Sequence, residues 1–515
     1  MYSLAGSLGR DENRILWHAI VGISSLELYG RSVTGVGISA SMDAGGSAGW
    51  DGTRGENLRQ ELRDDVRRMN PLDDEEEKRE ATRGARTGTI LTTARSPTDN
   101  AIRISPEPRF LMIRHWSLYD SMLHSPYLGS RLHIWSEQGR KRLHKLLAKM
   151  GVSLNQCKQS YTHMDMELKR GLRERLLSYA PIYGLNGLVP QDSPNRDGWG
   201  FVKCWGWKGC FNAHDVGIII GAILEIGKAG VGGSDGMHRY ESRNGSANKE
   251  QTRETGIFES EEWVRRFWEA YDALENVDVL KQALPTAQHL HRAIIRTGTT
   301  VIEKRQIRHL KAFRIAVVKE GPDLAMFTHP AALTKLALWV GEAIAEQERD
   351  QKGEIGKGGR PTPLVMASLN EPRGIYVVVG TGGGGGVFEF TARARRKARA
   401  EERRRRKEEK QAERERKRQE KLARRREAAE GSEDEAETEE EEDDDDDDDD
   451  DSDVTDDEGQ NHGLGRNRFG NAFQEVVDET NARVRIDSFE HCVVEVKKED
   501  LSQFLESLSM KVVVG

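Results

Sequence analysis

The stretch "PLVMASLNEPRGIYVVVGTGGGGG", residues 363–386, carries the clearest structural signal in the chain. Two apolar runs flank Glu-Pro-Arg-Gly, which predicts two strands joined by a turn. The six glycines that follow resemble a phosphate-binding loop, but such a loop carries Lys and then Ser or Thr after its last glycine. Here Val387 and Phe388 follow instead. We therefore predict that the second strand ends near Gly380 and that the glycines form a linker.

Strands and helices alternate on both sides of this hairpin. The runs "FRIAVVKEG" and "LAMFTHP" (313–321 and 324–330) predict strands, and "PAALTKLALWVGEAIAEQE" (330–348) predicts a helix. Farther on, "RFGNAFQEVVDETNARVR" (468–485) predicts a helix, and "HCVVEVKKEDLSQFLESL" (491–508) a strand followed by a helix. Alternation of this kind predicts an α/β domain. We expect residues 311–387 and 464–515 to form its two parts, separated by an insert over 388–463.

The insert holds two blocks of opposite charge. Residues 393–426 contain 19 Lys and Arg against 7 Glu, and residues 430–458 contain 22 acids and no base. Removing a block of +12 and a block of −22 from the total of −8 leaves +2 for the rest of the chain. A nearly neutral remainder gives no case for a surface dedicated to coating DNA.

Each block allows more than one interpretation. The basic block could form a solvated helix, neutralise its acidic neighbour or contain a nuclear import signal. The acidic run could solubilise the protein or bind basic partners such as histones. We expect both blocks to lack a fixed structure. The candidate import residues are Arg403, Arg404, Arg405, Arg406, Lys407, Arg424, Arg425 and Arg426.

The N-terminal part combines one apolar run with a long polar stretch. The run "ILWHAIVGIS" (15–24) suits a buried strand. Residues 32–103 are rich in Gly, Ser, Arg and acids, so we expect a mobile linker there. Residues 104–310 contain helical patterns, among them "SEEWVRRFWEAYDAL" (260–274), whose aromatic face we expect to dock on the protein. The predicted fold is α/β with a large all-α insertion domain.

Side chains that could carry chemistry are sparse. Four cysteines in 515 residues do not predict a disulfide framework, which favours a reducing compartment. Cys204, Cys210 and His214 lack the spacing of a structural zinc site, and we prefer an aromatic hairpin there. His115 and Asp120, five residues apart, do not share a helix face. We predict no catalytic residue, metal or cofactor.

Several ordered stretches resemble a known family. They include "RISPEPRFLMIRHWSLYDSM" (103–122), "LHIWSEQGRKRLHKLLAKMG" (132–151) and "MFTHPAALTKLA" (326–337), followed by "FEHCVVEVKKEDLSQFLESLS" (489–509). Together they are similar to the cell division control protein 45 family of eukaryotic replication factors. The resemblance covers most of residues 105–384 and 464–512.

The resemblance implies an ancestry shared with RecJ-type DHH phosphoesterases. Family members are expected to carry an N-terminal DHH-like domain, a helical domain that contacts the replicative helicase, and a C-terminal DHHA1-like α/β domain. The resemblance implies that residues 1–31 are a remnant of the first domain and that residues 104–310 form the second. The chain has no Asp-His-His triplet. We therefore expect that most of the DHH-like domain is missing, as in a truncated product or an incomplete gene model.

The same resemblance implies a nuclear, non-catalytic scaffold that acts in replication initiation and elongation. Its expected partners are the minichromosome-maintenance hexamer and the GINS tetramer, with origin chromatin, single-stranded DNA and the replicative polymerase machinery as further partners; no membrane is expected. Two alternatives stay open, a RecJ-like single-strand nuclease and a histone-binding module that acts through residues 430–458. The residues that we predict to face a partner are Arg114, Tyr119, Arg140 and Arg142.

Overall fold

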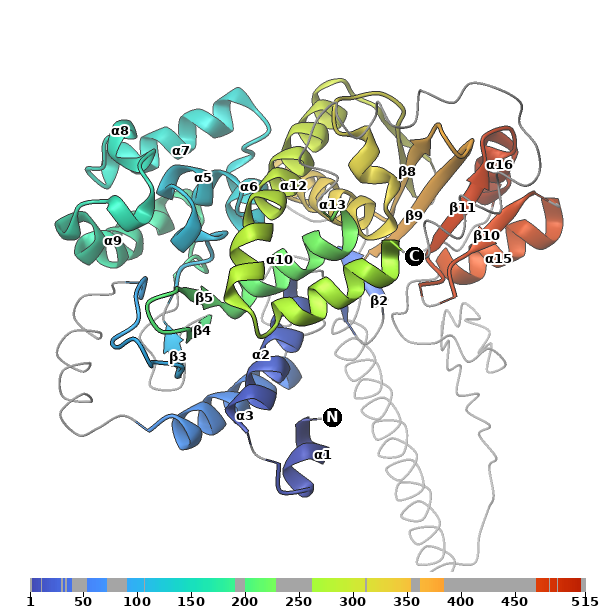
Figure 1. Ribbon diagram of the computed structural model, residues 1–515. Coiled ribbons are helices and arrows are strands. Elements are labelled where there is room, and N and C mark those ends of the chain that lie inside the picture. Colours follow the sequence, from blue (N-terminus) through green and yellow to red (C-terminus); the bar gives the residue numbers. More distant parts are fainter. Residues whose placement is uncertain are drawn as a thin grey trace, which may run out of the picture. The chain divides into compact units, whose positions relative to one another are not determined.

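The predicted hairpin lies within an eight-stranded mixed sheet (Figure 1). β8 (Leu364–Asn370) pairs antiparallel with β9 (Ile375–Gly383), and β7 (Arg314–Val318) runs parallel to β8. β6 (Ile307–His309) pairs with the other edge of β7. These assignments confirm the strands predicted over 313–321 and 363–380.

The structure is a computed structural model, and the observations below concern the residues that it describes. These are residues 2–10, 12–28, 31–32, 35–38, 53–71, 90–105, 107–189, 200–227, 262–310, 313–352, 362–383, 469–480, 482–488 and 490–510. They all belong to one unit of the chain, formed by residues 1–385 and 466–515.

β9 has two neighbours along one edge. β11 (Val493–Lys497) pairs antiparallel with residues 375–379 of β9. β2 (Gly35–Ile38) then pairs parallel with the last two residues, Gly382 and Gly383. The strand therefore runs three residues past its predicted end near Gly380, because a strand more than 300 residues upstream continues the pairing.

The two outer strands of this edge are short. β1 (Arg31–Ser32) pairs antiparallel with β2, and β10 (Val484–Ile486) pairs antiparallel with β11. Segments that precede and follow the charged insert thus meet in one sheet.

Gly380 occupies a position where a larger side chain does not fit. A Cβ atom added there would lie 2.4 Å from Cγ of Phe469, a fully buried residue at the start of α15 (Phe469–Thr480). The Gly380 amide also donates to the carbonyl of Cys492, 2.9 Å away. α15 packs against α16 (Leu501–Met510), in agreement with Figure 1. Both helices and β11 confirm the predicted elements, but the helix predicted over 468–485 ends at Thr480, and residues 484–486 form the strand β10.

Helices cover the sheet in succession. α13 (Pro330–Lys352), which was predicted, contacts β8 and β9, and α12 (Val277–Glu303) packs on α13. α10 (Ala213–Glu225) packs against both α12 and α2 (Asn13–Leu28). No helix among the described residues is both long and apolar enough to cross a membrane.

Two of the predicted strands are helical. Residues 15–24 lie in α2, where Leu16, Trp17 and Ile20 are fully buried at the spacing of one helix face. Residues 324–328 form a 3-10 helix, preceded by Asp323, whose buried carboxylate is bound by the Arg296 guanidinium of α12. This ion pair joins residues 27 positions apart, so the local sequence pattern could not reveal it.

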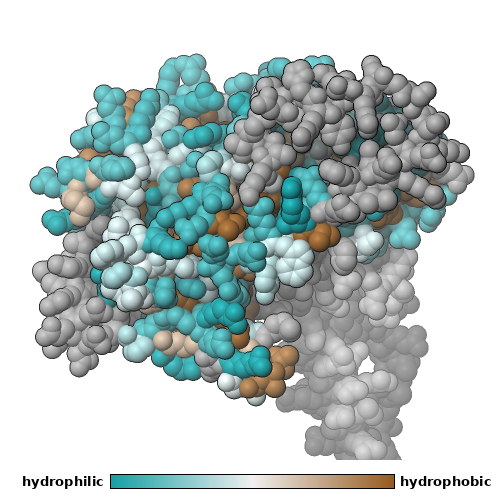
Figure 2. All heavy atoms as spheres, in the orientation of Figure 1, coloured by the Kyte–Doolittle hydropathy of each residue, from teal (hydrophilic) through white to brown (hydrophobic). Residues whose placement is uncertain are grey.

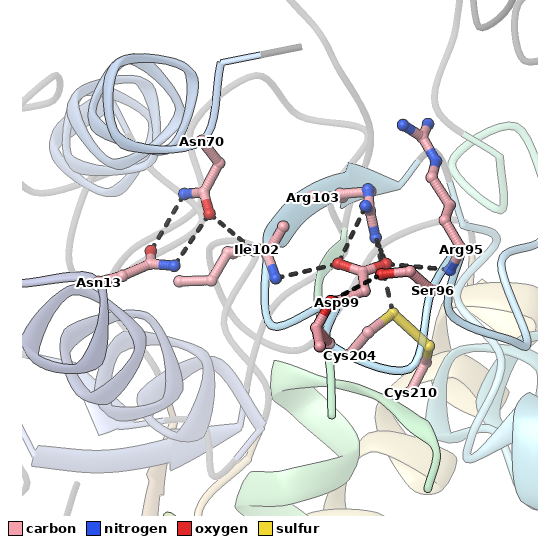
Figure 3. A network of polar contacts seen from close by, with 11 residues as sticks. Asn13, Asn70, Arg95, Ser96, Asp99, Ile102, Arg103, Cys204 and Cys210 are labelled. Carbon is pink, nitrogen blue, oxygen red and sulfur yellow. Dashed lines mark hydrogen bonds and ion pairs between the residues drawn. A yellow bond between two sulfur atoms is a disulfide. The ribbon is translucent and has the colours of Figure 1, made fainter. Parts of the chain in front are cut away.

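Part of the stretch predicted as a mobile linker is ordered. α3 (Thr53–Met69) buries Leu62 and Val66 in the main hydrophobic core. Figure 3 shows the polar contacts that join it to its neighbours: the side-chain amides of Asn13 and Asn70 bind each other, and Asn70 Oδ1 accepts from the Ile102 amide. The prediction that residues 32–103 form a mobile linker is therefore wrong for α3.

A small second sheet contains the predicted aromatic hairpin. β3 (Ile102–Ser105), β4 (Gly200–Cys204) and β5 (Cys210–Asn212) pair antiparallel in that order. Cys204 and Cys210 face each other and form a disulfide, also visible in Figure 3. A single bond is not a disulfide framework, but the sequence pattern did not predict it, and its two sulfurs are not available as thiolate ligands for zinc.

Residues 113–183 form short helices around a second hydrophobic cluster. The helices are short because His133 adopts a left-handed conformation (φ 59°), and Ser117, Ser125 and Ser136 each cap a new helix. The elements are η2 (Ile113–His115), α5 (Leu118–Leu123), α6 (Pro126–Leu132), α7 (Glu137–Lys149), α8 (Leu154–Cys157), η3 (Tyr161–His163), α9 (Met166–Tyr179) and η4 (Ala180–Tyr183).

Replacing Gly380 with alanine should lower the free energy of unfolding by about 1 to 3 kcal/mol, the usual cost of overpacking a core. The added methyl group would displace the Phe469 ring. Denaturant titration followed by circular dichroism measures the change. Gly22→Ala in α2 is the control, because nothing lies within 4 Å of its Cβ position, and it should leave stability unchanged or raise it. Equal stabilities for the two variants would contradict the packing role.

Candidate protein-interaction surface

Arg114 is buried beneath the predicted partner surface. Its side chain is 1% exposed, and its two terminal guanidinium nitrogens bind the two carboxylate oxygens of Glu107. Its Nε donates to the carbonyl of Leu91 at 2.6 Å, and Asn212 Nδ2 donates to Glu107 at 2.7 Å. The prediction that Arg114 faces a partner is wrong, because its charge compensates a buried carboxylate.

A second buried carboxyl group lies beside this pair. Burial raises the pKa of Asp215 to about 7, and the positive charge of Arg114 only partly opposes that rise. For Glu107 the balance is reversed: burial would raise its pKa, but the charge and hydrogen bonds of Arg114 outweigh it and hold that pKa below its usual value. One guanidinium therefore keeps Glu107 ionised and leaves Asp215 only weakly compensated.

His115 and Asp120 do not form an acid/base pair. The His115 ring is buried and stacked on Phe211, with 4.2 Å between ring centroids, and burial lowers its pKa to about 3. Asp120 instead accepts from the Ser117 hydroxyl at 2.6 Å, within the cap of α5. Among the residues that the structure describes, no group of three or more His, Cys, Asp or Glu is placed to hold a metal ion.

The other three predicted residues lie on or near α7. Tyr119 is half-buried, and its hydroxyl is 3.2 Å from Nε2 of His144, a residue of α7. Arg140 is exposed but donates back to the carbonyl of Ile134. Arg142 is exposed on the outer side of the helix. The structure thus brings Tyr119 close to α7 and separates Arg114 from the surface.

The outer face of α7 is basic. Lys141, Lys145 and Lys149 repeat every four residues, and Arg142 lies beside them, so the helical period places all four on one side. Lys141 pairs with Glu137 at 2.8 Å. Among the described residues, no acid forms an ion pair with the other three cations. We call these four residues the α7 basic face.

The inner face of α7 fixes the helix in place. Leu143, Leu146 and Leu147 are fully buried in the second hydrophobic cluster. At the start of the helix, a Cβ added to Gly139 would lie 1.9 Å from the carbonyl oxygen of His133, so the backbone approaches more closely than any other residue allows. The α7 basic face is therefore presented by a firmly packed helix.

The local charge explains why sequence reasoning found only Arg142 of this face and missed its three lysines. Residues 107–189 contain 13 Lys and Arg against 6 Asp and Glu. Outside the two charged blocks the total is near neutral, so averaging over the chain concealed the excess. Counting charge within the helical segment would have revealed it.

Two other predicted features have different outcomes. The candidate import residues 403–407 and 424–426 lie outside the described residues. The aromatic side chains expected to dock residues 260–274 on the protein are more than half exposed: Trp263, Phe267 and Tyr271. That prediction is wrong, and Ala270 and Ala273 make the buried contact instead.

Comparison with known proteins identifies the family. The CDC45 family model matches residues 1–511. The chain belongs to the CDC45 family. It is 39% identical over 518 residues to "Cell division control protein 45 homolog" of Schizosaccharomyces pombe, covering 99% of this chain and 63% of that protein. It is 27% identical to "Cell division control protein 45" of Saccharomyces cerevisiae, covering 99% of this chain and 60% of that protein.

A solved CDC45 structure has a similar fold. The crystal structure of CDC45 from Entamoeba histolytica superposes with a TM-score of 0.55 at 16% identity, covering 98% of this chain and 69% of that one. The match supports the mixed α/β architecture. The chain spans about 60% of the length of the two yeast CDC45 proteins.

Replacing Arg114 with methionine should lower the free energy of unfolding by about 3 to 5 kcal/mol, because Glu107 would be left as an unpaired buried charge. Thermal and urea unfolding measure the loss. Arg140→Met, which removes an exposed arginine from the same region, should change stability by less than about 0.5 kcal/mol. A Glu107→Met/Arg114→Met double variant should recover part of the loss, and its failure to do so would contradict the proposed cause.

Replacing Asp215 with asparagine should stabilise the protein most at alkaline pH. Because the folded pKa of about 7 exceeds the usual 3.8, the folded state binds more protons between these values, and stability falls as pH rises through them. The gain from Asp215→Asn should therefore be small near pH 4 and reach about 4 kcal/mol above pH 7. Unfolding curves at pH 5 and pH 8 test this. A gain that is larger at pH 5 would refute the assignment.

Proposed function

We propose that this CDC45-family chain is a non-catalytic scaffold subunit of the replicative helicase complex, acting in the initiation and elongation of DNA replication. In this role it joins the minichromosome-maintenance hexamer to the GINS tetramer in the nucleus. Family membership and the cell division control names of its relatives support the replication role. The observation that carries the scaffold role is the α7 basic face, a fixed protein surface rather than a site of chemistry.

The chemistry of the α7 basic face indicates an acidic partner. Its exposed lysine and arginine side chains would gain little from one another, since like charges four residues apart repel on a helix. An acidic surface on a partner would remove that repulsion and speed up association, mostly through electrostatic steering. Because exposed charges are screened within about 8 Å at physiological salt, such binding should weaken as salt rises.

The finer assignments belong to the same proposal. The N-terminal residues would derive from a DHH-like domain, the helical region would be the helicase-interaction domain, and the sheet that contains β8 and β9 would be DHHA1-like. Origin chromatin, single-stranded DNA and the replicative polymerase machinery are further proposed partners. In support of this division, β2 from the N-terminal part pairs parallel with β9 from the C-terminal part, so the two parts share one sheet.

Purified hexamer and purified GINS, each tested separately against the chain, provide the direct experiment. We expect the chain to bind at least one of them, and binding to weaken between 50 and 300 mM salt. An Arg142→Glu/Lys145→Glu/Lys149→Glu variant should bind at least about tenfold more weakly, with an unchanged melting temperature.

The matched control reverses three exposed cations elsewhere, in Lys304→Glu/Arg308→Glu/Lys319→Glu. It should bind like the unaltered chain. Folded protein that binds neither complex would sink the scaffold proposal. Equal losses in the two triple variants would show that net charge, and not the α7 basic face, determines binding.

A further inference from the structure

The helix over residues 262–273 has an inverted burial pattern. Its small residues Ala270 and Ala273 are buried in the main core, whereas its large apolar residues point into solvent. Five such residues are each between 54% and 57% exposed, and we call them the aromatic face: Trp263, Val264, Phe267, Trp268 and Tyr271. On the side of the molecule shown in Figure 2, hydrophilic residues dominate and hydrophobic residues form separate patches.

The aromatic face lies beside the buried side of the helix. At about 100° per residue, Ala270 and Ala273 mark one narrow arc, and the aromatic face continues from it over about 140°. Polar residues, Arg265 and Asp272 among them, occupy the remaining surface. The helix is therefore amphipathic with a wide apolar side, of which the protein itself covers only one edge.

Contacts with the rest of the protein hold this helix in position. The Arg266 guanidinium donates to the carbonyl of Glu225 at the end of α10 and pairs with Glu262. The Trp263 ring lies 5.3 Å from the ring of His329, next to the start of α13. The face is thus ordered before any partner binds, which lowers the entropic cost of binding.

The aromatic rings also support one another. Trp268 packs edge-on against Phe267 and Tyr271, with centroid distances of 5.4 and 5.8 Å. Trp and Tyr are the residue types most enriched among those that dominate binding energy. An exposed cluster of them at fixed geometry is typical of a docking site and unusual on a free surface.

The size of the face indicates what can cover it. Five large side chains, each about half exposed, present on the order of 500 Å² of apolar area. A stable dimer needs roughly 800 Å² on each partner. The face alone is therefore too small to hold a second copy of the chain in a stable dimer. A single helix that lies along the face matches the available area.

Charge around the face defines the chemistry of that helix. Arg265 and Asp272 are both exposed and border the apolar side seven residues apart, two helical turns. Single-stranded nucleic acid would need a basic groove beside its stacking platform. Here the exposed charges that border the face are one cation, Arg265, and one acid, Asp272, which do not form a basic groove. The charge therefore disfavours nucleic acid and favours a protein partner.

We propose that the aromatic face binds an amphipathic helix of a partner protein. That helix presents an apolar stripe to Phe267 and Trp268, with an acidic residue opposite Arg265 and a basic residue opposite Asp272. The inference deepens the scaffold role and rests on it only in taking the partner to be a replication protein.

Synthetic peptides test the recognition chemistry without any replication protein. The probe is a labelled 15-residue helical peptide with leucines at i, i+4 and i+7 and with Glu and Lys seven residues apart. Two companions replace this charge pair with Glu and Glu or with Lys and Lys, and a third replaces the leucines with serines. Fluorescence anisotropy on the full chain should give the tightest binding for the Glu/Lys peptide, about tenfold tighter than for the serine peptide.

Variants of the chain then locate the site. Phe267→Ala/Trp268→Ala should lose most of the preference for leucine over serine, since these positions contribute binding energy but no core packing. The matched control is Trp207→Ala, which removes a tryptophan that is 75% exposed in the β4–β5 turn and should bind like the unaltered chain. Asp272→Arg should shift the preference from the Glu/Lys peptide to the Glu/Glu peptide by about threefold.

The outcomes separate this inference from the scaffold proposal. Binding of the leucine peptides that is no tighter than that of the serine peptide, or that survives Phe267→Ala/Trp268→Ala, would overturn the aromatic face as a helix-binding site, whatever the helicase subunits do. An unchanged charge preference in Asp272→Arg would overturn the stated partner chemistry. The scaffold proposal is tested separately, by measuring how the unaltered chain and the α7 triple variant bind the hexamer and GINS.

Discussion

The backbone pairing of β9 is the constraint on which the rest of the sheet depends. β9 bonds to β8 along one edge, and along the other it bonds first to β11 and then to β2. β8 and β9 form a local hairpin, but β11 and β2 come from distant stretches of the chain, so the second edge of β9 is completed only when those segments meet it. The fully buried Val377, Val378 and Val379 lie at this meeting point. The hydrogen bonds of one strand therefore determine where the two parts of the α/β region join.

Local pattern predicted the elements whose environment is local. α13 and α16 were found because their apolar residues recur with the period of a helix, and β8 and β9 because two apolar runs flank a turn. Residues 15–24 were assigned wrongly because a short run of apolar residues has no period that separates a buried strand from a buried helix. The continuation of β9 through Gly383 was missed for a different reason: its partner, β2, lies at residues 35–38, and glycine carries no side-chain signal.

The candidate surface also has some features that the local sequence reveals and others that it does not. The α7 basic face can be recognised from the sequence, because its lysines recur every four residues and the charge counted over this segment is positive. The burial of Arg114 is not, because it depends on contacts with Leu91 and Glu107 and on the Asn212 amide that also binds Glu107. The exposure of the aromatic face is equally invisible, since periodicity identifies an apolar side but not what covers it. Sequence therefore predicted which residues share a face, and packing decided which faces stay open.

The contact between Gly380 and Phe469 has a consequence for how this chain can change. These two residues meet in the core although 88 residues separate them in the sequence. Closing a longer loop costs only about 0.6 kcal/mol for each doubling of its length. Residues 381–383 still belong to the sheet, but the number of residues between Gly383 and Phe469 should have little effect on the cost of bringing the two anchors together. The Gly380–Phe469 contact therefore depends far more on the fit of these two residues than on the length of chain that joins them.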